Sequence, residues 1–239
     1  MKKGNLKLSI VVLAGNNYDK KLYMQCKKTF NFADEIVEVD SKDIESFAFW
    51  RNRGMKQAKG EWVLYLDTDE EVTSSLKEEV EKIINTESSL NAYAVPRRNF
   101  IFGKEFKHSG QYPDYQIRLF RKKYFDKWTG DVHEQPNFKG ELGYLKSAMI
   151  HHKNMTISEM VDKTNKWSEI EADLMYKANH PPMNALRFFS AGFREFVQRF
   201  LKEKAFLDGK EGIIYGIYQI YSRLISYSKL WEKQLKDEK

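Results

Sequence analysis

Short apolar runs alternate with segments of helical periodicity over residues 1–96. Each apolar run is too short to indicate a helix and is bordered by turn-forming or polar residues, so we interpret these runs as buried strands. The predicted strands cover residues 6–13, 35–40, 62–66 and 92–96. The predicted helices between them cover residues 20–29, 47–58 and about 75–84. This alternation predicts a parallel sheet of the nucleotide-binding type.

The pattern changes after the fourth strand. Residues 97–150 are rich in arginine, aromatic residues and turns, and they predict β-hairpins and loops over the carboxyl edge of the sheet. The capping-box sequence Thr156-Ile157-Ser158-Glu159 predicts a helix that runs to about residue 178. Pro181-Pro182 marks a boundary, and two amphipathic helices follow it, separated by residues 206–209.

The third predicted strand ends in a cluster of carboxylates. Asp67 and Asp69 lie two residues apart, on one side of an extended chain, at the strand end where open α/β sheets bind ligands. Such a pair can share one divalent cation, which prefers oxygen ligands and can neutralise a departing diphosphate. The alternative interpretation is a strand followed by the acidic first turn of a helix, because Ser75-Leu76-Lys77-Glu78 reads as a capping box.

Composition limits the class of protein. The 239 residues, 41% hydrophobic and 14% aromatic, suffice for one large domain or for a domain with an appendage. The net charge of +6 favours phosphates or anionic lipid, whereas the acidic candidate site argues against nucleic acid. The single cysteine, Cys26, fits a reducing cytoplasm and is expected to have a packing role. The apolar N-terminal run imitates a signal peptide but lacks a cleavage site, and no run is long enough to span a membrane.

The last part of the chain carries a second functional signal. Residues 181–239 hold eleven Lys/Arg against seven Asp/Glu, together with eleven aromatic residues. Helices that are basic, aromatic and amphipathic, yet too short or polar to span, suit the surface of an anionic bilayer. The alternative is that these helices pack on the first domain or form a dimer contact.

Short motifs occur in a fixed order along nearly the whole chain. They are Ala33-Asp34-Glu35-Ile36-Val37, Val39-Asp40-Ser41, Arg51-Asn52, Gly60-Glu61-Trp62-Val63-Leu64, Leu66-Asp67-Thr68-Asp69-Glu70-Glu71, Pro96-Arg97-Arg98-Asn99, Tyr112-Pro113-Asp114-Tyr115-Gln116, Arg118-Leu119-Phe120-Arg121, Val132-His133-Glu134, His151, Phe206-Leu207-Asp208-Gly209 and Lys229-Leu230-Trp231-Glu232. This ordered set resembles the family 2 glycosyltransferases with the GT-A fold, in particular the bacterial lipopolysaccharide-core type of β-glucosyltransferase.

The resemblance implies an α/β fold: a Rossmann-like, mostly parallel sheet with flanking helices, an acceptor region of β-hairpins and loops, and a C-terminal helical appendage. It implies a catalytic domain over residues 1–180, with a donor half at 1–96, an acceptor half at 97–152 and a helix at 153–180. Residues 181–239 are then the appendage.

Two features depart from the family pattern. The loop after the first strand reads Asn16-Asn17-Tyr18-Asp19, where the family usually has Asn-Glu. Only ten residues separate Asp40 from Arg51, where the family usually places a helix and a strand. We therefore expect this sheet to lack one element on the nucleoside side.

The resemblance implies a nucleotide-sugar donor, a UDP-sugar by preference, across the carboxyl ends of the first strands. Asp40 would accept hydrogen bonds from the base or ribose. Arg51 would contact the nucleotide or diphosphate, because a guanidinium matches phosphate oxygens. Asp67 and Arg118 complete the implied donor-binding set. The alternatives are a turn aspartate at Asp40 and a solvated helix arginine at Arg51.

The implied metal site contains Asp67, Asp69 and His151 and holds Mn²⁺ or Mg²⁺ against the diphosphate. His151 is expected at the end of a strand over residues 145–150. An imidazole ligand favours Mn²⁺. The alternative for this histidine is a structural hydrogen bond.

Inversion at the anomeric carbon requires one base that deprotonates the acceptor hydroxyl. Glu134 is the preferred candidate, Asp114 is second and could instead orient the acceptor, and Asp131 is a third. Trp128, Tyr112 and Tyr115 could stack on sugar faces, although burial alone explains most such aromatics.

The leading hypothesis is an inverting, metal-dependent glycosyltransferase that acts on a glycan or lipid-linked acceptor in cell-envelope polysaccharide or lipopolysaccharide core synthesis. It would be cytoplasmic, or peripheral on the cytoplasmic face of the inner membrane. One alternative is a nucleotidyltransferase, which would usually show a glycine-rich phosphate loop after the first strand. Another is a catalytically impaired membrane-binding or scaffold protein on the same fold.

Overall fold

The computed structural model describes residues 6–15, 18–41, 46–87, 89–130, 134–153 and 155–237. The chain divides into two compact units. The first contains Met1–Arg98 and Pro113–His152, and the second contains Asn99–Tyr112 and Lys153–Lys239.

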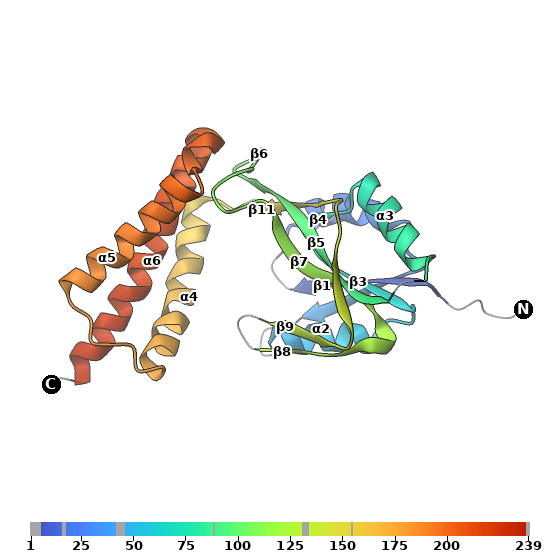
Figure 1. The fold of residues 1–239 in the computed structure, drawn as a ribbon, viewed down its shortest axis with the longest axis horizontal. Coiled ribbons are helices and arrows are strands. Elements are labelled where there is room, and N and C mark those ends of the chain that lie inside the picture. Colours follow the sequence, from blue (N-terminus) through green and yellow to red (C-terminus); the bar gives the residue numbers. More distant parts are fainter. Residues whose placement is uncertain are drawn as a thin grey trace, which may run out of the picture. The chain divides into compact units, whose positions relative to one another are not determined.

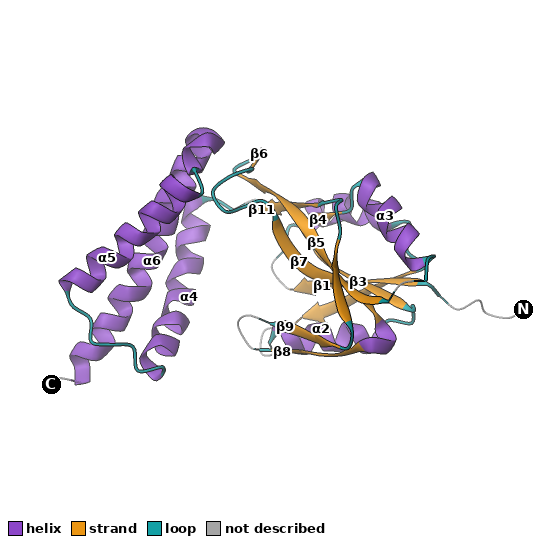
Figure 2. Cartoon of the chain, in the orientation of Figure 1, coloured by secondary structure: helices purple, strands orange, loops and turns teal. Residues whose placement is uncertain are grey.

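A twisted sheet is the centre of the first unit (Figures 1 and 2). Strands β1 (Leu8–Gly15), β2 (Glu35–Ser41) and β3 (Trp62–Asp67) are parallel, with β1 in the middle. Strand β7 (Asp114–Arg121) lies antiparallel between β3 and β5 (Leu90–Ile101), so β5 runs in the same direction as the first three. The predicted mixed α/β fold with a mostly parallel sheet is confirmed.

The remaining strands extend this sheet or form a hairpin. The sheet order is β2-β1-β3-β7-β5-β11-β4, where β11 is Met149–Lys153 and β4 is the short Glu70–Glu71. Strand β10 (Glu141–Tyr144) pairs with β5 in parallel. Strands β8 (Phe125–Thr129) and β9 (Gln135–Phe138) form a separate antiparallel pair, in agreement with the hairpins expected after residue 97.

Both faces of the sheet are buried, which explains the continuous apolar runs of its strands. One face packs against α1 (Lys20–Lys27) and α3 (Ser74–Ile84), and the other against α2 (Phe47–Gln57) and the β8–β9 hairpin. Cys26 of α1 is fully buried in the first of these cores. Burial raises the pKa of its thiol to about 12, so the predicted packing role is confirmed.

Two helix starts were predicted from capping-box sequences, and one is wrong. The N-cap of α3 is Thr73, whose Oγ1 accepts a hydrogen bond from the Leu76 amide, and Ser75 lies inside the helix. Thr73 also donates to the carbonyl of Ala148, a tertiary contact that local sequence does not reveal. The capping box of Thr156 and Glu159 at the start of α4 is present as predicted.

The second unit is mainly helical. Its helices are α4 (Ile157–Lys177), α5 (Ala185–Phe196) and α6 (Gly209–Asp237), and a π-helical turn, Val197–Lys202, follows α5. Both α4 and α5 pack against α6. Helix α4 thus lies in the second unit, whereas the sequence predicts that it belongs to the catalytic domain of residues 1–180. The buried residues of α4 are Met160, Thr164, Ser168 and Ala172, three of which are small or polar, so its sequence pattern does not reveal the partner.

The motif at residues 206–209 has a structural role in this unit. The buried Asp208 carboxylate accepts hydrogen bonds from the amides of Lys107 and His108 and from the hydroxyl of Ser109, at 2.8–3.1 Å. Gly209 has φ +75°, a conformation that favours glycine. The motif therefore anchors one loop of the second unit to the start of α6.

Within the described residues, no helix has the length and apolar character needed to cross a bilayer.

Candidate functional site

The carboxyl ends of β1, β2 and β3 lie at one edge of the sheet. Leu13 of β1 is level with Val39 of β2 and with Asp67 of β3. Asp40 therefore lies one residue beyond the level of Asp67, two strands away, which corresponds to about 10 Å across the sheet. In line with the short spacing in the sequence, β2 ends at Ser41 and α2 begins at Phe47.

Asp67 is held between two arginines. Its Oδ2 is 2.5 Å from Nη2 of Arg118 on β7, and its Oδ1 is 3.3 Å from Nη2 of Arg51 on α2. Both guanidinium groups are buried, with 5% and 7% of the side chain exposed. Burial alone would raise the pKa of Asp67, but the charges of Arg118 and Arg51 outweigh it and hold that pKa below its usual value. Asp67 is therefore a carboxylate at neutral pH.

Arg51 is fixed by aromatic rings as well as by charge. Its guanidinium lies 5.1 Å from the ring centroid of Trp128 and 5.7 Å from that of Tyr65. Its Nε is 3.1 Å from Oε1 of Glu134, and the Tyr65 hydroxyl donates to its backbone carbonyl at 2.8 Å. Arg51 thus joins Asp67 to Glu134 and has little freedom to move.

Glu70 and Arg97, which are not among the candidate site residues predicted from the sequence, extend this network. Glu70 is fully buried and accepts hydrogen bonds from the Asp67 amide at 2.9 Å, Arg118 Nη2 at 3.1 Å and Arg97 Nη1 at 3.3 Å. Arg97 Nη2 in turn lies 2.6 Å from Oδ2 of Asp114. Both residues were part of the family motifs, but their burial depends on the pairing of strands distant in the sequence.

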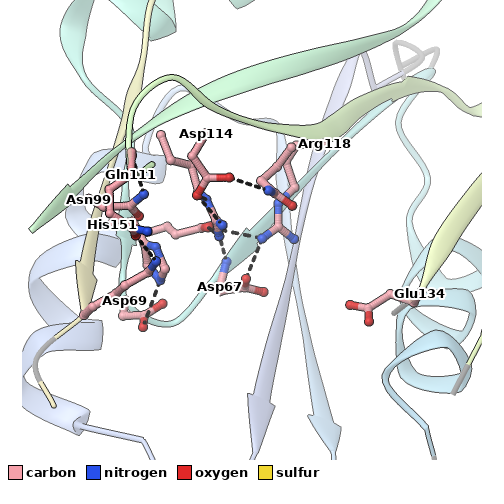
Figure 3. A network of polar contacts seen from close by, with 12 residues as sticks. Asp67, Asp69, Asn99, Gln111, Asp114, Arg118, Glu134 and His151 are labelled. Carbon is pink, nitrogen blue, oxygen red and sulfur yellow. Dashed lines mark hydrogen bonds and ion pairs between the residues drawn. The ribbon is translucent and has the colours of Figure 1, made fainter. Parts of the chain in front are cut away.

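Asp69 and His151 approach each other because β4 pairs with β11. The register places His151 opposite Glu70, and the His152 amide donates to the Asp69 carbonyl at 2.9 Å. The His151 Nε2 atom is then 3.5 Å from Oδ2 of Asp69. Figure 3 shows the two side chains turned toward each other. His151 lies within β11 rather than at the end of a strand over residues 145–150. The observed strand begins at Met149 and runs to Lys153, so it starts and ends later than expected.

A carboxylate and an imidazole suit Mn²⁺, and a carboxylate also suits Mg²⁺. Asp67 faces guanidinium groups on both of its oxygens, which leaves Asp69 and His151 as the pair that fits a cation. Among the described residues, no group of three or more His, Cys, Asp or Glu side chains is placed to hold a metal ion. Any cation at this pair would thus need further oxygen ligands, and diphosphate oxygens are of the right kind.

An open pocket of about 420 Å³ adjoins the network, and Arg51, Asp67, Arg118, Trp128 and Glu134 contribute to its lining. Three buried donors of these lining residues have no hydrogen-bond partner within the described part of the chain: Arg51 Nη1, Arg118 Nε and Trp128 Nε1. Buried charged donors without an acceptor are costly. An anionic ligand in this pocket would supply the missing acceptors.

The structure thus brings most of the predicted site residues together. Arg51, Asp67, Arg118 and Glu134 line one pocket, and Asp114 is linked to them through Arg97. The proposed sugar-stacking residues separate: Trp128 and Tyr115 line the pocket, whereas Tyr112 belongs to the second unit. Residues 131–133, which include the third candidate base, Asp131, lie outside the described residues.

Comparison with known proteins identifies the family. The model of glycosyl transferase family 2 matches residues 26–139. An uncharacterised glycosyltransferase of Rickettsia bellii is 23% identical over 235 residues, covering 86% of this chain and 80% of that protein. The lipopolysaccharide core biosynthesis glycosyltransferase LpsC of Rhizobium meliloti is 20% identical over 193 residues, covering 78% of this chain and 70% of that protein. Residues 26–139 therefore form a family 2 glycosyltransferase domain, and the predicted enzyme class is confirmed.

A solved structure shows the same fold. The mannosyltransferase PcManGT from Pyrobaculum calidifontis, in complex with GDP-Man and Mn²⁺, superposes with a TM-score of 0.51 at 11% identity. The match covers 97% of this chain and 89% of that chain. The GT-A fold expected from the sequence is confirmed.

Glu70 offers a direct test of the buried network. Glu70→Gln keeps the shape but removes the charge that compensates Arg97 and Arg118, so it should lower the free energy of unfolding by about 3–5 kcal/mol. The matched control is Glu71→Gln, whose partly exposed side chain contacts His152, and it should change stability by less than about 1 kcal/mol. Urea unfolding measures both, and equal losses would show that the network contributes no more than a surface pair.

Proposed function

We propose that this protein is an inverting, metal-dependent glycosyltransferase that moves a sugar from a nucleotide-diphosphate donor to a glycan or lipid-linked acceptor in cell-envelope polysaccharide synthesis. The observation that carries the proposal is the pair of buried guanidinium groups around Asp67, which retain unsatisfied N–H donors beside an open pocket. The names of the similar proteins support the class: one acts in lipopolysaccharide core biosynthesis, and another binds GDP-Man and Mn²⁺.

The donor diphosphate would bind to the two arginines. Arg51 Nη1 and Arg118 Nε are the unused donors, and a guanidinium forms strong charge-assisted hydrogen bonds to phosphate oxygens. Asp67 has the role of holding both guanidinium groups in place. Asp40, at the same edge of the sheet, would accept hydrogen bonds from the ribose or base of a UDP-sugar.

Asp69 and His151 would hold Mn²⁺ or Mg²⁺, and the diphosphate would complete the coordination. When bound, the cation supplies a Lewis acid that neutralises negative charge on the departing diphosphate. Asp69 is more exposed than its neighbours, with 37% of its side chain accessible, so it is open to a ligand. The imidazole of His151 favours Mn²⁺ over Mg²⁺ in this pair.

Glu134 is the proposed base. Its carboxylate would take the proton of the acceptor hydroxyl while that oxygen attacks the anomeric carbon and the bond to the diphosphate breaks on the opposite face. Arg51 holds Glu134 through Nε, so one arginine orients both the base and, through Asp67, the donor site. Asp114 is the second candidate. It is fixed by Arg97 and by the Gln116 amide at 2.7 Å, a setting that also suits a residue that orients the acceptor.

Metal-dependent donor binding is the first expected consequence. A nucleoside diphosphate with Mn²⁺ should raise the melting temperature, and EDTA should abolish that shift. Asp69→Ala should lose this shift and stay folded, because Asp69 is partly exposed. The exposed Asp126→Ala is the control and should keep the full shift. An undiminished shift in Asp69→Ala would place the metal elsewhere.

The assignment of the base has its own test. Glu134→Gln keeps an oxygen for the Arg51 hydrogen bond but loses the proton acceptor. Sugar transfer should therefore fall by about 10²–10⁴, the usual range for a positioned base, while nucleotide binding persists. Transfer would be followed with a panel of nucleotide sugars and Mn²⁺. Near-normal transfer in Glu134→Gln together with inactive Asp114→Asn would assign the base to Asp114.

A further inference from the structure

Helix α5 presents an apolar strip to solvent. Leu186, Phe189 and Phe193 are 83%, 71% and 67% exposed. At about 100° per residue these three side chains fall within about 60° of one another around the helix. The buried residues of α5, Ala191 and Glu195, lie on the opposite side of the helix, so the strip points away from the helices of its own unit.

The exposed apolar surface continues beyond α5. Leu201, Phe206 and Leu207 follow in the turns before α6, with exposed fractions of 62%, 49% and 53%. On α6, Ile213 and Ile217 are 41% and 58% exposed. Single exposed apolar residues are ordinary. So many bulky ones in residues 185–224, the helical hairpin of α5 and the first half of α6, indicate an interaction surface.

The charges of this hairpin are arranged in an unusual way. Residues 185–224 are all described, and none of their four carboxylates is exposed. Glu195, for example, is 9% exposed and Asp208 is 3% exposed. By contrast, six of the seven cations are exposed: Arg187, Arg194, Lys202, Lys204, Lys210 and Arg223. Within residues 185–224, all the charged side chains that are exposed are therefore cations.

We propose that this hairpin docks on the surface of an anionic lipid bilayer, with the α5 strip in the headgroup region and Arg187 and Arg194 against lipid phosphates. An apolar strip flanked by cations is the pattern of helices that lie in a bilayer interface. A second copy of the chain is a poor occupant, because self-association through this face would bring like charges together. A lipid-linked acceptor would be presented at the same surface, although the docking itself does not depend on the enzymatic activity.

One cation of the hairpin has a different role. The Arg199 Nε atom is 2.7 Å from Glu195, and its Nη1 atom is 2.8 Å from Glu203. Its side chain is 19% exposed, so it neutralises the inward-facing carboxylates and is unsuitable as a docking variant. Arg187 and Arg194 lie about 20° apart around α5, beside the strip, and are exposed.

Vesicle binding of the full chain tests the proposal. Vesicles of phosphatidylcholine with about one third phosphatidylglycerol should bind the protein at low salt, and neutral vesicles should bind it at least about tenfold more weakly. Arg187→Gln with Arg194→Gln should weaken binding to the anionic vesicles by about 30-fold, since each cation contributes about fivefold. Phe189→Ser with Phe193→Ser should weaken it by about tenfold or more, including the part that persists at high salt.

Helix α4 supplies the matched control. Ile170 and Leu174 are 40% and 53% exposed on a helix that also carries the exposed Glu169. Ile170→Ser with Leu174→Ser removes the same kind of side chain and should leave vesicle binding unchanged. Wild-type protein that ignores anionic vesicles, or equal losses in the α4 and α5 variants, would overturn the proposal. A dimer in sedimentation that Phe189→Ser with Phe193→Ser dissolves would instead assign the strip to self-association.

Discussion

The site depends on one carboxylate between two buried guanidinium groups. Asp67 ends strand β3, and its ion pairs hold Arg51 of α2 and Arg118 of β7 at the edge where the parallel strands finish. Two buried arginines would be costly if they had no such partner. Asp67 and Glu70 together provide the compensation, and the remaining N–H groups are left for a ligand. The same charges thus stabilise the fold locally and support the proposed anion site.

The neighbouring carboxylates of this segment have different partners. Asp67 and Glu70 are engaged by arginines, whereas Asp69, between them in the sequence, turns to His151. This difference follows from the short strand β4, which pairs with β11 and brings the histidine alongside. Arg51 extends these contacts to Glu134, so the proposed donor and base positions are linked through side-chain contacts. The loss of the Asp67 carboxylate should therefore disturb both arginines.

The pattern of apolar and polar residues predicted the strands of the first unit well, because both faces of the sheet are buried and its strands are continuous apolar runs. The predicted start of α3 is wrong, because the N-cap is Thr73 and not Ser75. A tertiary hydrogen bond from Thr73 to the Ala148 carbonyl accompanies this N-cap. The sequence did not show that α4 packs with α6, because three of its four buried residues are small or polar. At the site, the motif order identified the residue types. Arg51 and Arg118 are 16 and 51 residues away from Asp67 in the sequence, so sequence spacing does not reveal that both pair with it.

The central claim is that Asp67 fixes the arginines while Asp69 and His151 receive the cation. Diffraction from crystals that contain a nucleoside diphosphate and Mn²⁺, measured at a wavelength where manganese scatters anomalously, tests this claim most directly. We expect one anomalous peak within coordination distance of Asp69 and His151, next to the diphosphate, with Asp67 still between Arg51 and Arg118. A peak on Asp67 with the arginines displaced, or diphosphate bound away from both arginines, would contradict the account.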